Sequence, residues 1–338
     1  MEKWNVKVKQ LTMQGDFLGL LAEEQQSMTW QSVIRKMPRN VMAFATRLCT
    51  NSLNSPDNLV RWGKRKMGAC PLCSCPNRTL AHITNFCPVA LQQGRYTWRH
   101  DSVLQQITSI VKSLATKDTE VYADLEGLQI NGTTIPADIL ISSGKGSKPD
   151  LVLIDRLKWT IALMELTCPL PRAEENATMR KNKTYSQLQI ALEDKGFTTH
   201  LVPFEICSNG YISKRNTLNI NSVLKKFKVN LIAKTYTNMS QLSLLSTMSI
   251  FYAYQTKEWV SPPLLSPWIV FVYFCLRPLI CASVGDRIPA AYSIRPVPCP
   301  LGRVMQFKCW VWVVYLRFPI VLRLQDSKIP RFQDSKFF

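Results

Sequence analysis

The sequence is poor in acidic residues, and it lacks both a complete phosphate-binding loop and a secretory signal. It has 23 Asp and Glu against 42 Lys and Arg, which gives a formal net charge of +19. This excess is spread along the chain and predicts an anionic polymer or surface as partner. The stretch "SSGKGSK" lacks the full spacing of a phosphate-binding loop, so it does not indicate a nucleotide site.

The other missing feature is a secretory signal. The N-terminal stretch "MEKWNVKVKQ" has no apolar core, so we expect a protein that is not secreted. The 11 cysteines are an odd number. Together these points favour a reducing compartment with some thiols on a metal over a framework of disulfides.

A cysteine cluster, "CPLCSCPNRTLAHITNFCP", has the spacing of a metal site. Cys70, Cys73, His82 and Cys87 form the pattern C-x2-C-x8-H-x4-C, which suits a closed, tetrahedral, structural Zn²⁺ site. Cys75 is a possible substitute ligand with poorer spacing. The alternative is a set of unpaired cysteines in a small reduced core.

The stretch "KPDLVLIDRLKWTIALMELTCP" carries a carboxylate near each end of two apolar runs. The runs predict two buried strands, and residues 156–159 predict a four-residue hairpin loop between them. In a hairpin symmetric about that loop, Asp150 lies opposite Glu165, about 4.5–5.5 Å away on the same face. Two buried carboxylates repel each other, and a bridging Mg²⁺ or Mn²⁺ removes that cost. Alternatively, Asp150 caps a turn and Glu165 reaches solvent.

The segment after the hairpin predicts a basic helix over residues 173–192, with Arg180, Lys181 and Lys183. A metal site beside a lysine is what metal-dependent phosphodiester hydrolysis requires, because the lysine stabilises developing negative charge. The strands before and after the hairpin complete a predicted α/β layer with a mixed sheet.

The flanking segments differ in character. Residues 1–66 are predicted to be helical and end in a basic run, which is either a phosphate-contacting patch or a solvated helix end. An amphipathic helix is predicted after Arg99-His100-Asp101, with Asp101 as its N-cap. Residues 236–338 show no consistent period and repeat "QDSK", so we expect an irregular tail that packs poorly. A membrane anchor over residues 259–284 is the minority alternative. The basic run offers four candidate DNA-binding residues: Arg61, Lys64, Arg65 and Lys66.

The chain also resembles the C-terminal region of non-LTR retrotransposon polyproteins that carry a restriction-like endonuclease. The resemblance covers roughly residues 30–213, about half the chain. It rests on "NLVRWGK", the CCHC zinc knuckle, "GRYTWRHD", "KPDLVLID", "ELTCP", "RKNKTY" and "VPFEICSNGYIS" in the family's order. It implies four regions: a helical region over 1–66, the zinc knuckle over 67–98, a nuclease domain with a PD-(D/E)XK restriction-endonuclease-like fold over 99–235, and the tail.

The resemblance implies roles for particular residues. Asp150 and Glu165 would hold the catalytic metal, and Lys181 would be the catalytic lysine, with Lys183 displaced by one position from the second lysine of the family. Arg99, His100 and Asp101 match a motif required for DNA handling or cleavage. The sequence departs from the family after Glu165, where a threonine replaces the lysine of the usual triplet. No reverse transcriptase precedes the knuckle in this chain.

These observations predict a nuclear or cytoplasmic DNA-binding protein with Mg²⁺-dependent endonuclease activity that nicks DNA. The expected partner is DNA, and two further candidates are RNA of the element and a reverse transcriptase acting in trans. The competing hypotheses are a catalytically inactive nucleic-acid-binding remnant and, with the least support, a membrane-associated protein.

Overall fold

The computed structural model describes residues 10–11, 15–23, 30–66, 68–76, 79–125, 135–139, 148–257 and 259–261, all within one compact unit, Met1–Gly285. The tail beyond residue 261, and with it most of the suggested membrane anchor, lies outside these residues. The described helices are α2 (Gly15–Glu23), α3 (Trp30–Ile34), α4 (Arg39–Cys49), α5 (Pro56–Arg61), α6 (Pro88–Gln92), α7 (Arg95–Leu114), α8 (Glu174–Asp194), α9 (Lys214–Leu224) and α10 (Ala233–Ala253). Short helical turns are η1 (His82–Phe86), η2 (Pro171–Ala173) and η3 (Lys225–Phe227).

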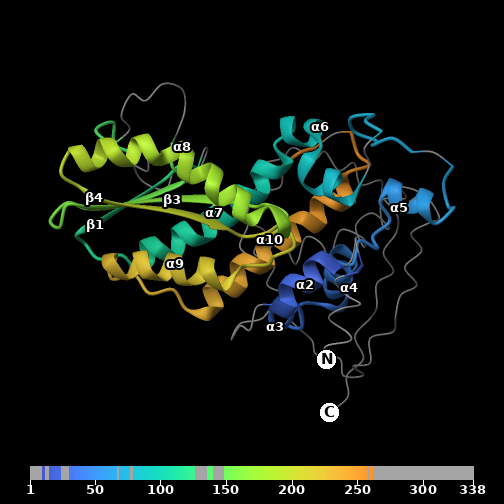
Figure 1. Ribbon diagram of the computed structural model, residues 1–338, viewed down its shortest axis with the longest axis horizontal. Coiled ribbons are helices and arrows are strands. Elements are labelled where there is room, and N and C mark those ends of the chain that lie inside the picture. Colours follow the sequence, from blue (N-terminus) through green and yellow to red (C-terminus); the bar gives the residue numbers. More distant parts are fainter. Residues whose placement is uncertain are drawn as a thin grey trace, which may run out of the picture. The chain divides into compact units, whose positions relative to one another are not determined.

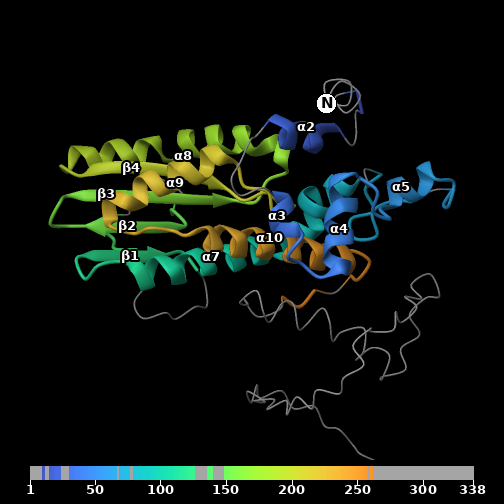
Figure 2. The same ribbon diagram turned by 90° about the horizontal axis from the view of Figure 1, so that it is seen from below.

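The sheet has four strands in the order β1 (Thr119–Ala123), β2 (Leu151–Asp155), β3 (Thr160–Thr167) and β4 (Thr198–Glu205). The first two pairs are antiparallel, and β3 pairs with β4 in parallel through the crossover helix α8. Figure 1 shows this sheet flanked by helices, and Figure 2 shows the strands from below. The predicted mixed α/β architecture with a helical N-terminal region is confirmed.

The hairpin register is also as predicted. Asp155 pairs with Thr160 and Leu153 pairs with Ala162, so residues 156–159 form the connecting loop. Asp155 stabilises this loop because its carboxylate accepts hydrogen bonds from the backbone N–H of Lys158 at 3.0 Å and from its ammonium group at 2.6 Å.

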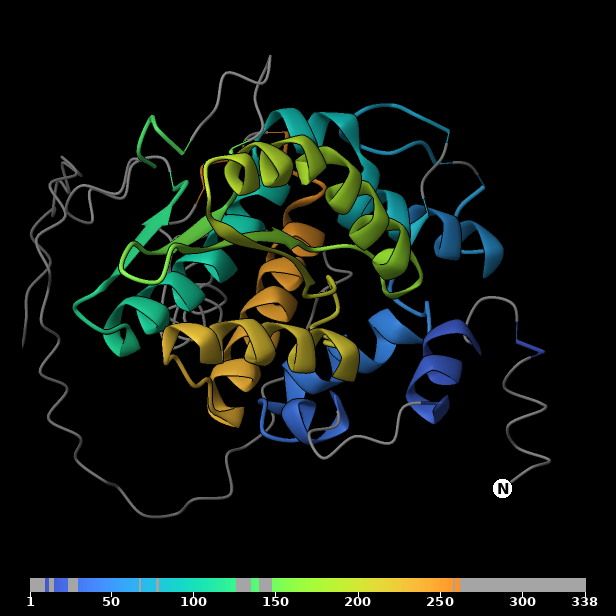
Figure 3. The same cartoon turned by 60° about the vertical axis from the view of Figure 1, so that its left-hand side comes forward.

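Two apolar cores lie on the two faces of the sheet. On one face, Val152 and Ile154 of β2 pack with Tyr185, Leu188 and Leu192 of α8. On the other face, alternate residues of the same strands pack with α7, α9 and α10. Figure 3 shows α8 on one side of the sheet and α9 and α10 on the other. This alternation follows from the two-residue period of a strand, and every residue of β2 is therefore buried.

Helix α10 corrects the prediction that the irregular tail begins at residue 236. Residues 233–253 form one helix that packs along α7, with Met239, Leu242 and Leu245 almost fully buried. Three of its buried serines donate to carbonyl oxygens, as Ser243 does to Cys207 at 2.8 Å. Within the described part of the chain, no helix is long and apolar enough to cross a membrane.

Helix α7 begins earlier than predicted. It starts at Arg95 after Gly94, which has a left-handed backbone with φ 71°, so Asp101 lies inside the helix and is not its N-cap. The polar first turns are buried, not exposed, because Arg95 donates to the carbonyl oxygens of Ala253 and Thr256 at 2.7 and 2.8 Å. The helix therefore runs without interruption across the predicted domain boundary between residues 98 and 99.

Gly210 in the turn after β4 gives a stability prediction. Its φ is +81°, and an added Cβ would lie 2.5 Å from the backbone oxygen of Ser240 on α10. Gly196 has a similar φ of +90° with no atom within 4 Å of the added Cβ, so it is the matched control. We expect Gly196→Ala to cost about 1–2 kcal/mol through backbone strain, and Gly210→Ala to cost a further 1–3 kcal/mol, roughly, through overpacking. Equal melting temperatures for the two variants would contradict this.

Candidate functional site

Asp150 and Glu165 lie at the same edge of the sheet. The paired residues of β2 and β3 end at Leu151 and Met164, and just beyond them the backbone N–H of Asp150 donates to Glu165 Oε2 at 3.2 Å. The backbone N–H of Leu166 in turn donates to Asp150 Oδ2 at 2.8 Å. These two hydrogen bonds bring the carboxylates of Asp150 and Glu165 to the same end of the two strands.

Lys181 of α8 completes this cluster by forming an ion pair with Glu165 Oε1. Glu165 is only 3% exposed. Burial and the nearby charge of Asp150 raise the pKa of Glu165, and Lys181 partly offsets this effect. Two carboxylates that lie close together with little solvent repel each other, and a cation stabilises them. Lys181 supplies one positive charge there.

His100 of α7 reaches the same cluster. Its Nδ1 lies 2.9 Å from Asp101 Oδ1, and its Nε2 lies 3.1 Å from Asp150 Oδ2 and 3.2 Å from the carbonyl oxygen of Leu166. Burial disfavours the charged imidazole, but hydrogen bonds to Asp101 and Asp150 outweigh it and raise the pKa of His100 well above its usual value. His100 therefore links Asp101 to Asp150 and holds the Asp150 carboxylate in place.

The donor atoms at this end of the strands are all of one chemical type. Asp150 and Glu165 offer carboxylate oxygens, and the Leu166 carbonyl lies beside the same imidazole nitrogen as Asp150. All are oxygens, which Mg²⁺ and Mn²⁺ prefer.

Two candidates from the sequence lie outside this cluster. Arg99 is 2% exposed and donates to the carbonyl oxygens of Thr84 and Cys168, so it cannot contact DNA directly in this conformation. Its guanidinium faces the interior because it joins separate segments of backbone. Lys183 is exposed on α8, and no contact to Asp150 or Glu165 is found for it among the described residues.

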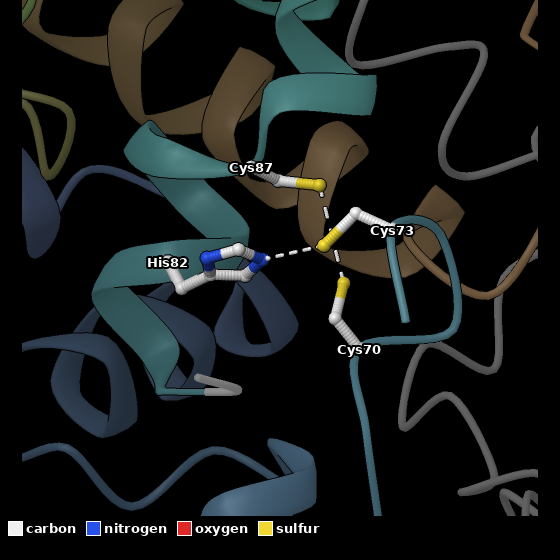
Figure 4. Close-up of side chains that lie close together, drawn as sticks. All are labelled: Cys70, Cys73, His82 and Cys87. Atoms are coloured by element: carbon white, nitrogen blue, oxygen red, sulfur yellow. Dashed lines mark hydrogen bonds between the residues drawn. The ribbon is translucent and has the colours of Figure 1, made fainter. Parts of the chain in front are cut away.

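The cysteine cluster forms a compact site with all four predicted ligands. The ligand atoms of Cys70, Cys73, His82 and Cys87 lie within 4.8 Å of one another, as Figure 4 shows. Cys70 Sγ is 3.9 Å from Cys87 Sγ, and Cys73 Sγ is 3.3 Å from His82 Nε2. Zinc–sulfur bonds of about 2.3 Å place tetrahedral sulfur ligands about 3.8 Å apart, so these spacings suit one Zn²⁺.

Local backbone structure positions the four ligands. The turn from Cys70 is closed by the backbone N–H of Cys70, which donates to the carbonyl of Cys75 at 3.0 Å. His82 opens the π-helix η1 and Cys87 directly follows it. Cys75 lies outside the group, so the predicted alternative ligand is not part of the site.

The electrostatics of the cluster are compatible with zinc. Burial lowers the pKa of His82, which keeps the imidazole neutral, as a metal ligand requires. Burial and the neighbouring thiols raise the pKa of Cys87 to about 11. Several thiolates this close are stabilised by a metal, because the ion compensates the charge that burial and mutual repulsion disfavour.

Comparison with known proteins agrees with this geometry. Residues 17–93 match a family model described as zinc-binding in reverse transcriptase. No curated protein matches the chain. The matched segment includes all four ligands and helices α2 to α6, so it joins the N-terminal helices and the knuckle that the sequence had placed in separate regions.

The predicted DNA-binding residues lie in this zinc-binding segment and are on its surface. Trp62, 37% exposed, stands between them, with the guanidinium of Arg61 5.8 Å and the ammonium of Lys64 5.6 Å from the centre of its ring. The segment thus presents four exposed cations, two of which lie near the Trp62 ring: Arg61, Lys64, Arg65 and Lys66.

Two residues that the sequence did not single out connect these sites. The hydroxyl of Tyr96 accepts from the backbone N–H of Cys87 at 3.0 Å and donates to the carbonyls of His82 and Ile83, so it orders the backbone at two zinc ligands. The side chain of Asn85 donates to the carbonyl of Cys168 at 3.0 Å. Tyr96 lies in the "GRYTWRHD" motif, one of the motifs that carry the family resemblance, and this could have drawn attention to it. Nothing in the sequence marks Asn85.

Proposed function

We propose that this protein is a retrotransposon-derived, DNA-binding endonuclease that nicks DNA with the help of Mg²⁺ or Mn²⁺. The observation that carries the proposal is the convergence of Asp150, Glu165 and Lys181 at one edge of the sheet, with His100 hydrogen-bonded to Asp150. The match to a zinc-binding segment of reverse transcriptases supports the retrotransposon origin.

Each residue has a distinct part in this chemistry. Asp150 and Glu165 would hold a divalent cation, which, when bound, polarises the scissile phosphate and acidifies a water molecule. Lys181 stabilises the negative charge that develops on the phosphate, and His100 orients the Asp150 carboxylate.

Binding to DNA is a separate part of the proposal. The exposed basic patch around Trp62 supplies phosphate contacts, as do other dispersed Lys and Arg residues. Action on chromosomal DNA would place the protein in the nucleus. RNA of the element and a reverse transcriptase in trans are further proposed partners.

The test is a nicking assay with the full chain and supercoiled plasmid. We expect open-circular plasmid to accumulate with Mg²⁺ or Mn²⁺, and its formation to stop when a chelator removes these ions. A mobility-shift assay should show DNA binding in both conditions. Binding without any metal-dependent nicking would favour the inactive nucleic-acid-binding alternative. If the protein neither nicks nor binds DNA, the whole proposal is overturned.

A further inference from the structure

The backbone carbonyl of Cys168 lies just beyond β3, three residues after Glu165, and accepts two hydrogen bonds, one from the zinc-binding segment and one from α7. Asn85 Nδ2 donates to it at 3.0 Å and Arg99 Nη2 at 3.3 Å. Asn85 belongs to η1, between the ligands His82 and Cys87. The end of the strand that carries Glu165 is thus tied to the segment that carries two zinc ligands.

Arg99 strengthens the same connection. Besides Cys168, its guanidinium donates to the carbonyl of Thr84 on η1 and to the hydroxyl of Thr247 on α10, both at 3.0 Å. A planar guanidinium fixes the relative positions of the groups that it bridges, because its donors point in set directions. Its neighbour in the sequence is His100, which contacts Asp150.

The segment η1 lies between two of the candidate zinc ligands. The π-helix is a rare form, and the hydroxyl of Tyr96 contacts both of its ends, the carbonyl of His82 at the start and the backbone N–H of Cys87 just after the end. A zinc ion bonded to His82 and Cys87 would fix both ends of this segment, because metal-ligand geometry is specific. Asn85 lies between the two fixed points.

We infer that Asn85 is a positioning residue for the acid pair, and that zinc in the knuckle acts through it to hold the end of β3 and the Glu165 carboxylate in place. The consequence for catalysis rests on the proposed nuclease function. The structural consequence does not, since it concerns only the order of the β3 end.

The experiment compares Asn85→Leu, which keeps approximate side-chain size and removes the donor, with Asn219→Leu at an exposed position of α9. In the full chain with zinc, we expect Asn85→Leu to lower kcat for nicking by about 10- to 100-fold, because small misplacements of reacting groups are costly. KM for plasmid DNA and the zinc content should stay at wild-type values. Asn219→Leu should change none of them.

Hydrogen exchange provides a readout that is independent of activity. The amides of Leu166 and Ser208, which donate to Asp150 Oδ2 and to the carbonyl of Pro169, report the order of the strand ends. We expect faster exchange there in Asn85→Leu and in zinc-stripped wild type, and a smaller additional effect of zinc removal in the variant.

The outcomes separate this inference from the proposed function. Unchanged exchange at the strand ends in both Asn85→Leu and zinc-stripped wild type would overturn the inference, whatever the protein cleaves. Faster exchange in a protein that does not nick DNA would support the link between zinc and strand while removing the proposed nuclease. A drop in zinc content in Asn85→Leu would place the residue in the knuckle alone and overturn the link.

Discussion

Asp150→Asn and Glu165→Gln should each reduce plasmid nicking by a factor of about 10²–10³ or more, while DNA affinity stays near its wild-type value. Each change removes a charged oxygen ligand from the acid pair, so the divalent cation loses a charged contact. Affinity for DNA should persist because it depends on dispersed Lys and Arg contacts to phosphate. The measurements are initial nicking rates and mobility shifts at one salt concentration, with Asp194→Asn at the exposed end of α8 as control.

The same two variants should also differ from the wild type in how Mg²⁺ affects their thermal stability. A ligand that binds only the folded state raises stability by about 2.7 kcal/mol at a concentration 100 times its Kd. We therefore expect the melting temperature of the wild type to rise with Mg²⁺ and that of either acid variant to stay unchanged. Wild-type nicking by Asp150→Asn, or an unaltered Mg²⁺ response, would contradict the assignment of the acid pair.

Lys181→Met separates charge stabilisation from metal binding within this series. Lys181 is ion-paired with the buried Glu165, so its removal leaves that carboxylate with less compensating charge. The variant should nick about 10²–10³-fold more slowly, and its melting temperature without metal should fall. Its response to Mg²⁺ should be larger than that of the wild type, because the cation no longer competes with the ammonium group.

The hairpin was predictable because several independent constraints agreed on one register. Apolar runs of similar length flank a polar four-residue segment, and a shift by one residue would have turned every side chain to the other face. The same register ends at Leu151 and Met164, next to Asp150 and Glu165 in the sequence. The zinc ligands were predictable for a similar reason, since their spacing alone constrains how the backbone can close around one ion.

Helix α10 was not predictable from periodicity because it is buried on nearly all sides. An amphipathic stripe identifies a helix that faces solvent on one side, whereas α10 mixes apolar residues with buried serines and threonines around its whole circumference. Several of its hydroxyls donate to carbonyl groups, as Ser249 does to Leu245 at 2.9 Å. Polar residues inside a core therefore made the segment resemble an irregular tail.

The start of α7 was missed because its arginines are buried through contacts made by distant segments. Arg95 donates to carbonyls at the C-terminal end of α10, where the partial negative charge of the helix favours a cation. Arg99 bridges η1, α10 and the end of β3. Neither set of hydrogen-bond partners is visible in the local sequence, so the sequence does not indicate that these two arginines are buried.

Cys73→Ser should remove zinc from the full chain and lower its stability by at least about 4 kcal/mol, since loss of a structural metal is among the most damaging single changes. In a folded unit of this size, that corresponds to a fall of roughly 8–16 °C in melting temperature. Cys75→Ser is the matched control, because Cys75 is two residues away and outside the ligand group. Zinc content by elemental analysis and thermal melting by circular dichroism measure the two effects.

The loss of structure in Cys73→Ser should be concentrated in the backbone around the four zinc ligands. Without zinc, the pKa of Cys87, raised by burial and by the neighbouring thiols to about 11, keeps that thiol protonated at neutral pH. The Cys87 thiol would then contribute only as a small apolar group. Retention of zinc by Cys73→Ser, or an equal loss in Cys75→Ser, would show that the ion is held by a different set of ligands.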